Sequence, residues 1–491
     1  MAIVIGVDIG TTSTKVVAFD QNGQAKASAN HGYPLIQTQP DMAEEEPEAI
    51  FDAVCLGLRE VVSTVDARDV CGVSFSAAMH SVIVMDANDK PLTRVLTWAD
   101  NRGAKFADNL RDTPQGQAIF AHTGVPIHPM SPLIKLMWLN QAMPAVMAQA
   151  AHVIGIKDYV WYRLFGEYVQ DYSLANATGL FDLKTQTWFP QALALAGVSS
   201  DQLPRLVAPT YHQTGMQIDL GLPKETPVFI GASDGVLSNL GVAAQKPGTV
   251  ALTIGTSAAI RTVVDQPVVE PDGKLFTYYL APDRYVVGGP VNNGGVVWQW
   301  AQNTFLPKGD LPAMEQLITP IKAGADGLLF LPYLGGERAP LWDADARGSF
   351  IGLTKQTREA TMARAVLEGL CFNLKAVLEM VSVVAGQPTV IHATGGFARS
   401  TLWKQMLCDI LNVPIKLPDS FESSALGAAV IAMQALGLID SLDEVEQMVG
   451  STTTLMPGSN TAEYRRLWPI WQGMNTQLAG TYQALADFQR Q

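Results

Sequence analysis

The sequence is poor in cysteine, in charge and in positive charge above all, and each shortage excludes a class of protein. Four cysteines are scattered along the chain without a CxxC pair, at Cys55, Cys71, Cys371 and Cys408. This pattern indicates no disulfide framework and is typical of a reducing compartment. Charged residues make up 16% of the chain and the formal net charge is −13, which argues against a general nucleic-acid or anionic-membrane surface.

Signals for membranes and secretion are missing as well. No basic region precedes the apolar stretch at the N-terminus, so a signal peptide is not indicated. The most apolar late stretch, residues 425–439, is interrupted by Gln434 and is too short to span a bilayer. We therefore expect a soluble cytoplasmic protein with small-molecule partners and no nucleic-acid or membrane partner. The oligomeric state stays open, and a homodimer is one expectation.

Three familiar motifs are also absent, namely the GxxxxGK[ST] loop, GxGxxG and HExxH. A polar turn near the N-terminus is present instead. Residues 3–7 form a near-continuous apolar run that predicts a strand buried on both faces, and residues 16–19 resume a strand. Residues 8–15 are therefore expected to form a tight turn between two strands, within a three-stranded meander over residues 3–29.

The side chains of this turn suit a phosphate. Gly10 allows a ligand to approach the backbone, while Thr11, Thr12 and Lys15 offer hydrogen-bond donors for phosphate oxygens. Asp8, at the end of the strand, is suited to hold a hydrated Mg²⁺. The alternative is a polar hairpin that only closes a core strand.

A second copy of this pattern lies at residues 250–260, where an apolar strand meets Gly255-Thr256-Ser257 and a further apolar run. With 491 residues and 48% hydrophobic residues, the chain predicts two or three globular domains. Two phosphate-type hairpins, one in each half, suggest a duplicated domain that grips a nucleotide. Residues 242–249 are expected to join the halves.

A carboxylate suited to catalysis follows a short apolar strand at residues 228–230. Asp234 is expected at the end of that strand and the start of a helix, on the same side as the phosphate turns. A carboxylate there can accept the proton of a substrate hydroxyl that attacks phosphorus. An ordinary helix N-cap is the equally simple alternative.

Candidate sugar-binding residues follow the strand predicted at residues 73–76. His80 is expected where strands change partners, although a single histidine is more often structural. Trp98 can stack on a sugar while Asp100 and Arg102 bond its hydroxyls. The two charges can equally form a surface pair.

Two glycine-rich turns and a small-residue run complete the pattern. Residues 288–295 and 395–400 each open a predicted helix, which suits close approach of a nucleotide and a seat for adenosine. Residues 171–178 are interpreted as a loop. The small residues at 424–430 indicate close helix packing rather than chemistry.

The two hairpins resemble the phosphate motifs of the actin-like ATPase superfamily, and the motifs together resemble the FGGY carbohydrate kinases. The likeness runs from about residue 3 to about residue 440 in the family's order. It comprises the turn at 8–15, Met79-His80, Trp98-x-Asp100-x-Arg102, Asp234, the turn at 255–257, Gly-Glu-Arg-x-Pro at 336–340, Arg347-Gly348 with Gly352-Leu353, and the turn at 395–400.

This resemblance implies an α/β fold of two ribonuclease H-like domains flanking a central cleft. It implies residues 1–243 as the N-terminal domain, with the sugar site, first phosphate motif and base, and residues 244–491 as the C-terminal domain. ATP and Mg²⁺ are the implied cofactors. The implied roles are general base for Asp234; metal binding for Asp8 and Asp234; nucleotide binding for Gly10, Thr11, Thr12, Lys15, Gly255, Thr256, Gly294, Gly395, Gly396 and Ser400; and substrate binding for Met79, His80, Trp98, Arg102 and Asp234.

Within the family, three stretches most resemble the gluconate kinases, at residues 97–102, 124–132 and 289–295. At the position where glycerol kinases carry an Arg-Glu pair, this chain has Met79-His80, and in this it resembles the xylulose and gluconate kinases. The expected reaction is phosphorylation of the terminal hydroxyl of D-gluconate to 6-phosphogluconate. His80, His128, Arg102 and the amide of Asn293 are candidates to meet the carboxylate. The alternatives are xylulose or another sugar as substrate and, more remotely, a non-catalytic sugar sensor or actin-like assembly protein.

Overall fold

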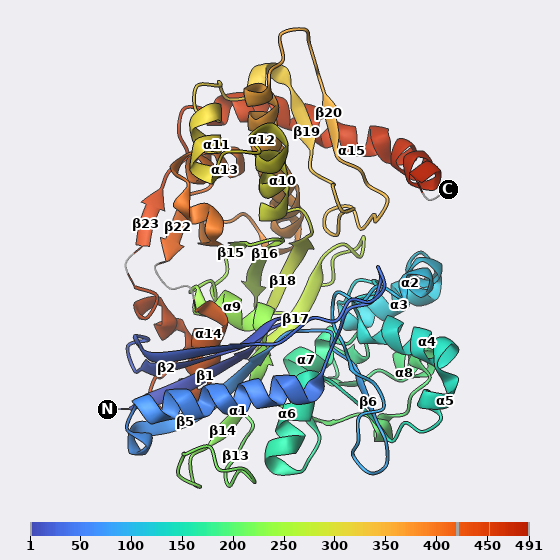
Figure 1. The fold of residues 1–491 in the computed structure, drawn as a ribbon, viewed down its shortest axis with the longest axis vertical. Coiled ribbons are helices and arrows are strands. Elements are labelled where there is room, and N and C mark those ends of the chain that lie inside the picture. The colour runs from blue at the N-terminus through green and yellow to red at the C-terminus, as the bar shows by residue number, and fades with distance from the viewer. Residues whose placement is uncertain (1, 419–421, 451, 490–491) are drawn as a thin grey trace. The chain divides into compact units, whose positions relative to one another are not determined.

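The computed structural model describes residues 2–418, 422–450 and 452–489, and Figure 1 shows its fold. The chain folds into two compact units. Unit 1 comprises Met1–Gln245, Val264–Val286 and Glu422–Val449, and unit 2 comprises Lys246–Val263, Val287–Phe421 and Gly450–Gln491. Two segments distant in sequence therefore complete unit 1.

The central sheet of unit 1 follows the order β13-β14-β5-β1-β2-β3. Strands β1, β5 and β14 are parallel, whereas β1, β2 and β3 form an antiparallel meander, as predicted. The strands are β1 (Ile3–Ile9), β2 (Ser13–Asp20), β3 (Ala25–Gly32), β5 (Val70–Ala77), β13 (His212–Gln213) and β14 (Val228–Ser233). The carboxyl ends of the three parallel strands consequently meet at one edge of the sheet.

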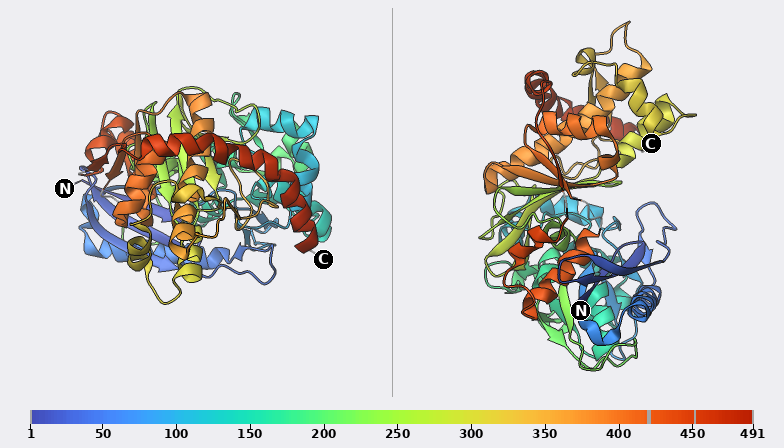
Figure 2. Two further views of the ribbon diagram at one scale, coloured as in Figure 1. Left: turned by 90° about the horizontal axis from the view of Figure 1, so that it is seen from above. Right: turned by 90° about the vertical axis from the view of Figure 1, so that its left-hand side faces the viewer.

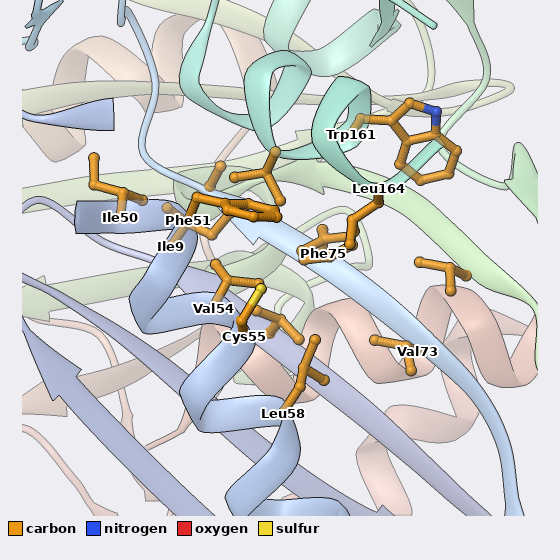
Figure 3. Packing of buried hydrophobic residues seen from close by; sticks show 14 of the residues in the cluster. Ile9, Ile50, Phe51, Val54, Cys55, Leu58, Val73, Phe75, Trp161 and Leu164 are labelled. Atoms are coloured by element: carbon orange, nitrogen blue, oxygen red, sulfur yellow. The ribbon is translucent and has the colours of Figure 1, made fainter. Parts of the chain in front are cut away.

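Helices cover both faces of this sheet. Alternate residues of β1, including Ile5 and Val7, join a core with α1 (Pro47–Thr64) and α6 (Ile156–Phe165). Figure 3 shows Phe51 and Val54 of α1 close to Phe75 of β5. On the other face, α14 (Ser423–Ala435) packs against α9 (Asp234–Gly241) and β1. The result is a three-layer α/β arrangement.

The rest of unit 1 consists of further helices and short strands, some of which form a second hydrophobic cluster that contains Leu110, Leu136 and Leu193. Its helices are α2 (Ala104–Arg111), α3 (Pro114–Thr123), α4 (Pro132–Ala142), α5 (Pro144–Met147), α7 (Tyr172–Ala177) and α8 (Pro190–Ala196). Its strands are β4 (Glu44–Glu45), β6 (Ile83–Met85), β7 (Val95–Leu96), β8 (His152–Ile154), β9 (Val169–Asp171), β10 (Phe181–Asp182), β11 (Thr187–Trp188), β12 (Arg205–Val207) and β17 (Phe276–Ala281).

The loop predicted at residues 171–178 is wrong, because the segment forms the short helix α7. Asp171 caps that helix by accepting hydrogen bonds from the backbone amides of Ser173 and Leu174 at 2.9 and 3.1 Å. The capping aspartate, followed by Tyr, Ser, Leu and Ala, is the sequence signal for this helix start.

The sheet of unit 2 follows the order β18-β16-β15-β21-β22-β23. Strand β15 pairs antiparallel with β16 and parallel with β21, which repeats the pairing of β1 with β2 and β5. The strands are β15 (Thr249–Ile254), β16 (Ala258–Val264), β18 (Arg284–Val291), β21 (Val390–Gly395), β22 (Ile415–Pro418) and β23 (Thr452–Leu455). The predicted second hairpin and the duplication are both present.

Helices and a small hairpin complete unit 2. They are α10 (Gly295–Phe305), α11 (Leu311–Ile318), α12 (Glu359–Ala385), α13 (Thr401–Leu411) and α15 (Thr461–Gln489), with strands β19 (Leu329–Leu331) and β20 (Ser349–Ile351). Figure 2 shows α15 as a long red helix. Its Trp471 is fully buried and donates a hydrogen bond to the carbonyl of Phe330 at 2.8 Å. Over the part of the chain that the structure describes, no helix has the length and apolarity needed to cross a membrane.

Candidate active site

The carboxyl edge of the unit 1 sheet brings the two predicted acidic residues together. Asp8 lies opposite Ser76 in the parallel register of β1 and β5, and Ser76 lies opposite Ala232 of β14. Asp234 follows that strand directly as the first residue of α9, and Ser233 occupies the N-cap position. The interpretation of Asp234 as the N-cap is therefore wrong, and its carboxylate accepts a hydrogen bond from the Gly235 amide at 2.7 Å.

The electrostatics of Asp8 reflect this neighbourhood. Burial and the negative charge of Asp234 raise the pKa of Asp8 to about 7, although the Ser76 hydroxyl donates a hydrogen bond to it at 2.7 Å. Two carboxylates close together repel one another, and a divalent cation between them relieves the repulsion. Among the described residues, no group of three or more His, Cys, Asp or Glu side chains is arranged to hold a metal. A cation here would thus use these two carboxylates together with water or phosphate oxygens.

The first predicted phosphate turn lies beside this edge. The Gly10 amide bonds to the Ser13 carbonyl at 3.0 Å, which closes the turn, and Thr12 is exposed at its tip. The indole of Trp98 donates a hydrogen bond to the Thr11 hydroxyl at 2.9 Å. A predicted sugar-binding residue therefore touches a predicted phosphate-binding residue.

The turn is shorter than the predicted residues 8–15, because β1 continues to Ile9 and β2 begins at Ser13. Lys15 therefore lies in β2, where it forms an ion pair with Glu422 at the N-cap of α14. Its side chain is 35% exposed. Glu422 also adds to the negative charge that raises the pKa of Asp8. The ammonium of Lys15 is thus placed near the carboxylates by a residue more than 400 positions later in the chain, a distance that sequence patterns do not bridge.

His80 follows β5 in a left-handed backbone conformation with φ 69° and is 7% exposed. Its Nδ1–H donates a hydrogen bond to the Ala177 carbonyl at 2.7 Å, and the Tyr278 hydroxyl lies 3.3 Å from Nε2. The buried Lys135 donates a hydrogen bond to the His80 carbonyl at 2.9 Å. The first two contacts hold the ring and the third holds the backbone. The preceding Met79 is half-buried at the same strand end.

The alternative of a surface pair between Asp100 and Arg102 is wrong, because Asp100 is 1% exposed. The guanidinium of Arg102 lies 2.7 Å from the Asp100 carboxylate and 2.6 Å from that of Glu44, and it stacks over the Trp138 ring. Asp100 also accepts a hydrogen bond from the Ala43 amide at 3.1 Å. Arg102 is therefore the centre of a part-buried ion cluster, and its role toward a substrate stays a prediction.

Unit 2 contains a pocket of about 420 Å³ where the predicted nucleotide-binding turns converge. Its lining residues are Ile254, Gly255, Gly295, Trp298, Leu311, Pro312, Glu315, Gly396, Phe397, Arg399, Ser400 and Trp403. Three of the predicted nucleotide-binding residues therefore lie in one cavity. The aromatic walls of the cavity were not predicted. There Trp403 packs edge-on against Trp298 at 6.1 Å and Phe397 at 5.9 Å between ring centroids.

Close packing explains two of the glycines beside this pocket. A Cβ on Gly294 would lie 2.5 Å from the Ser257 backbone, and one on Gly395, where φ is +119°, would lie 2.0 Å from the Ile254 carbonyl oxygen. The Gly295 amide bonds to the Gly255 carbonyl at 2.7 Å and the Val296 amide bonds to the Thr256 carbonyl at 3.2 Å. The start of α10 thus contacts the second predicted phosphate turn directly.

Ser400 has a structural role at the same pocket, since its hydroxyl caps α13 by accepting a hydrogen bond from the Trp403 amide at 3.0 Å. Gly396 differs from its neighbours, because a Cβ there would meet no atom within 4 Å. Its surroundings therefore allow a side chain that points into open space.

Gly396→Val should consequently fold normally and weaken nucleotide binding. We expect the KM for ATP to rise by about tenfold, because a branched side chain occupies volume that the nucleotide needs, and about 1.4 kcal/mol of lost binding corresponds to this factor. Initial rates against ATP concentration measure it. Gly480→Ala on α15, where a Cβ also meets no atom within 4 Å, is the control. An unchanged KM for ATP would show that the nucleotide does not use this pocket.

The comparisons with known proteins agree with this geometry. The chain matches the N-terminal domain of the FGGY family of carbohydrate kinases over residues 3–241 and the C-terminal domain over residues 250–436. The chain belongs to the FGGY family of carbohydrate kinases. The predicted family and its two-domain, ribonuclease H-like fold are thereby confirmed, and ATP is the phosphate donor that a kinase of this family implies.

Named relatives extend over nearly the whole kinase. The gluconokinase of Bacillus subtilis is 45% identical over 99% of this chain and 98% of the relative. The xylulose kinase of the same organism is 28% identical over 100% of both chains. Two solved structures from Lactobacillus acidophilus, one described as gluconate kinase and one as ligand-bound xylulose kinase, each have a TM-score of 0.96 and 40% identity. Both cover 99% of this chain, and they are covered over 99% and 100% of their own lengths respectively.

Proposed function

We propose that this kinase transfers the γ-phosphate of ATP to the terminal hydroxyl of D-gluconate and so produces 6-phosphogluconate. The observation that carries the proposal is the 45% identity to a gluconokinase along the whole chain, against 28% to the xylulose kinase of the same organism. A difference of this size over equal coverage favours gluconate as the substrate.

In this proposal Asp234 is the general base. It lies at the carboxyl edge of the sheet, where it would accept the proton of the attacking hydroxyl as the phosphoryl group is transferred. Asp8 and Asp234 would hold Mg²⁺, whose charge, when bound, neutralises phosphate oxygens. The raised pKa of Asp8 fits a site that is built to receive a cation.

The remaining predicted residues divide between the two substrates. Residues 1–243 would supply the sugar site, the base and the first phosphate turn, and residues 244–491 would supply the second turn and the adenosine pocket. Toward the nucleotide stand Gly10, Thr11, Thr12, Lys15, Gly255, Thr256, Gly294, Gly395, Gly396 and Ser400. Toward the sugar acid stand Met79, His80, Trp98 and Arg102. Most of the catalytic effect would come from positioning and charge neutralisation.

The carboxylate of gluconate needs hydrogen-bond donors, and four predicted candidates already have partners within the fold. The amide of Asn293 donates to the Gly336 carbonyl at 2.7 Å and to Glu337 at 3.0 Å, and Arg102 already serves two carboxylates. His80, which donates a hydrogen bond to the Ala177 carbonyl at 2.7 Å, and His128, which accepts one from the Met130 amide at 3.1 Å, are the other two candidates. A cytoplasmic location and a homodimer stay predictions.

The test is a comparison of kcat/KM for gluconate, xylulose, glycerol and ribulose at one Mg-ATP concentration. Gluconate should lead xylulose by about tenfold or more, since a charged hydrogen bond contributes about 1.5–3 kcal/mol. Omission of Mg²⁺ should abolish turnover. If xylulose leads by a similar factor, the gluconate assignment fails although the kinase assignment stands.

Xylulose is the second candidate because one solved structure with 40% identity is described as a xylulose kinase. A non-catalytic sugar sensor or assembly protein is disfavoured, since a pure binding protein needs no carboxylate at position 234. ADP release in the presence of a sugar acid separates these classes directly.

A further inference from the structure

We propose that a closed ring of buried contacts through Lys157, Asp171 and Ser173 positions the base Asp234 by fixing the end of β14, the strand that it follows. This inference rests on the proposed function, because it assigns these residues to the placement of its base. None of the three would touch a substrate, so they are positioning residues. The ring lies wholly within unit 1.

The first half of the ring is an ion pair in the core. Lys157 of α6 and Asp171 at the start of α7 are both 0% exposed, and their charged groups lie 2.7 Å apart. The ammonium of Lys157 also donates a hydrogen bond to the carbonyl of Ala232 at 3.0 Å. The buried ammonium of Lys157 therefore fixes the backbone carbonyl two residues before Asp234.

The second half of the ring returns through hydroxyl groups. Asp171 accepts a hydrogen bond from the Ser173 amide at 2.9 Å. The Ser173 hydroxyl lies 2.8 Å from that of Ser233 and accepts a hydrogen bond from the Ser233 amide at 3.2 Å. Ser233 is the residue before Asp234. The ring therefore holds both polar groups of the Ala232–Ser233 peptide, its carbonyl through Lys157 and its N–H through Ser173.

An irregularity in β14 explains why this strand end needs such support. The pairing of β14 with β5 shifts in register between Phe229 and Ala232. Gly231, at this bulge, has φ +64°, and a Cβ there would lie 1.8 Å from the Phe75 carbonyl oxygen. The bulge shifts the register in which the last residues of the strand pair with β5, and the ring adds contacts that fix this shifted strand end.

The cost of the arrangement also points to a role beyond stability. A buried ion pair is at best a weak source of stability, because desolvation of both charges offsets their attraction. Its geometric effect is strong, since all partners must keep their positions in a medium of low polarity. A misplacement of about 1 Å in an active site can lower the rate by about 10²-fold.

Ser173→Ala is the cleanest test, because it opens the ring without leaving a buried charge unpaired. We expect kcat for gluconate to fall by about 10- to 100-fold, while KM for ATP and gluconate changes by less than about twofold. Ser74→Ala is the matched control. Ser74 is 0% exposed in the neighbouring strand β5, and its hydroxyl has no hydrogen-bond partner within the described ranges. Its kcat should equal that of the unmodified enzyme.

A second measurement separates positioning from general damage. In the Asp234→Asn background, Ser173→Ala should change the residual rate by less than about twofold, since the group that it positions is already lost. Equal fold-losses in both backgrounds, or a kcat for Ser173→Ala within about twofold of the unmodified enzyme, would overturn the ring as a positioning device.

Asp171→Asn keeps the cap of α7 while removing the charge that faces Lys157, and it provides the same test if Ser173→Ala does not fold. It should lower kcat in the unmodified background and leave the residual rate of Asp234→Asn unchanged. If the proposed role of Asp234 as the base is wrong, the result is different: Asp234→Asn alone would then keep the rate of the unmodified enzyme. This outcome does not depend on the rates of the Ser173 and Asp171 variants.

Discussion

Asp234→Asn should lower kcat by about 10²–10⁴-fold, the usual contribution of a general base. The amide has the size and shape of the carboxylate but cannot accept the proton of the attacking hydroxyl. It can still accept the hydrogen bond that the Gly235 amide donates at 2.7 Å, so the start of α9 should persist. Initial rates of ADP release at saturating gluconate and ATP measure the loss.

The control is a carboxylate-to-amide change away from the proposed site. Asp66→Asn replaces the exposed N-cap of a short helical turn, where Asn caps about as well as Asp and a surface ion pair contributes little. It should leave both kcat and thermal stability unchanged. Turnover of Asp234→Asn within about threefold of the unmodified kinase would remove Asp234 from the role of base, since a base contributes far more than that.

Local patterns in the sequence predicted the parts of the molecule that local interactions build. The run at residues 3–7 and the strand at 16–19 correctly predicted the β1–β2 hairpin, although both strands extend into the predicted turn at 8–15 and leave only residues 10–12 between them. The same reasoning gave its copy at residues 250–260. In both cases a near-continuous apolar run indicates a strand buried in a sheet, and glycine followed by threonine indicates the turn.

The pocket of unit 2 was only half predicted, for a physical reason. Gly395 beside the pocket has a backbone requirement that a short motif records, since its φ is +119°. The aromatic walls of the pocket have none, because Trp298 and Trp403 lie on helices at ordinary core spacings. A tryptophan that lines a cavity and one that fills a core look alike in sequence.

Long-range partners were beyond prediction for a related reason. His80 meets Tyr278, 198 positions later, and Lys15 meets Glu422 at the start of α14. Both later segments belong to unit 1, although the chain passes through unit 2 before it reaches α14. Periodicity reports which face of an element is buried, but it does not report which distant element covers that face.

Gly427→Ala should destabilise the kinase although alanine is the better helix former. Gly427 lies within α14, and a Cβ there would lie 2.1 Å from the Leu237 carbonyl oxygen of α9. Forcing the two helices apart costs about 3 kcal/mol, against a gain of about 1 kcal/mol in helix propensity. The net loss of roughly 2 kcal/mol should lower the midpoint of urea unfolding.

The same substitution at Gly480 should have the opposite sign. Gly480 lies in helix α15, and a Cβ there meets no atom within 4 Å, so Gly480→Ala keeps the propensity gain of about 1 kcal/mol. The small residues at 424–430, interpreted from sequence as close packing, are thus distinguished from a merely flexible run. Helix α14 also approaches β1 closely, because a Cβ on Gly6 would lie 2.0 Å from the Ala425 carbonyl oxygen.

If Gly427→Ala stabilises the kinase as Gly480→Ala does, the close packing of α14 against α9 is not required for stability.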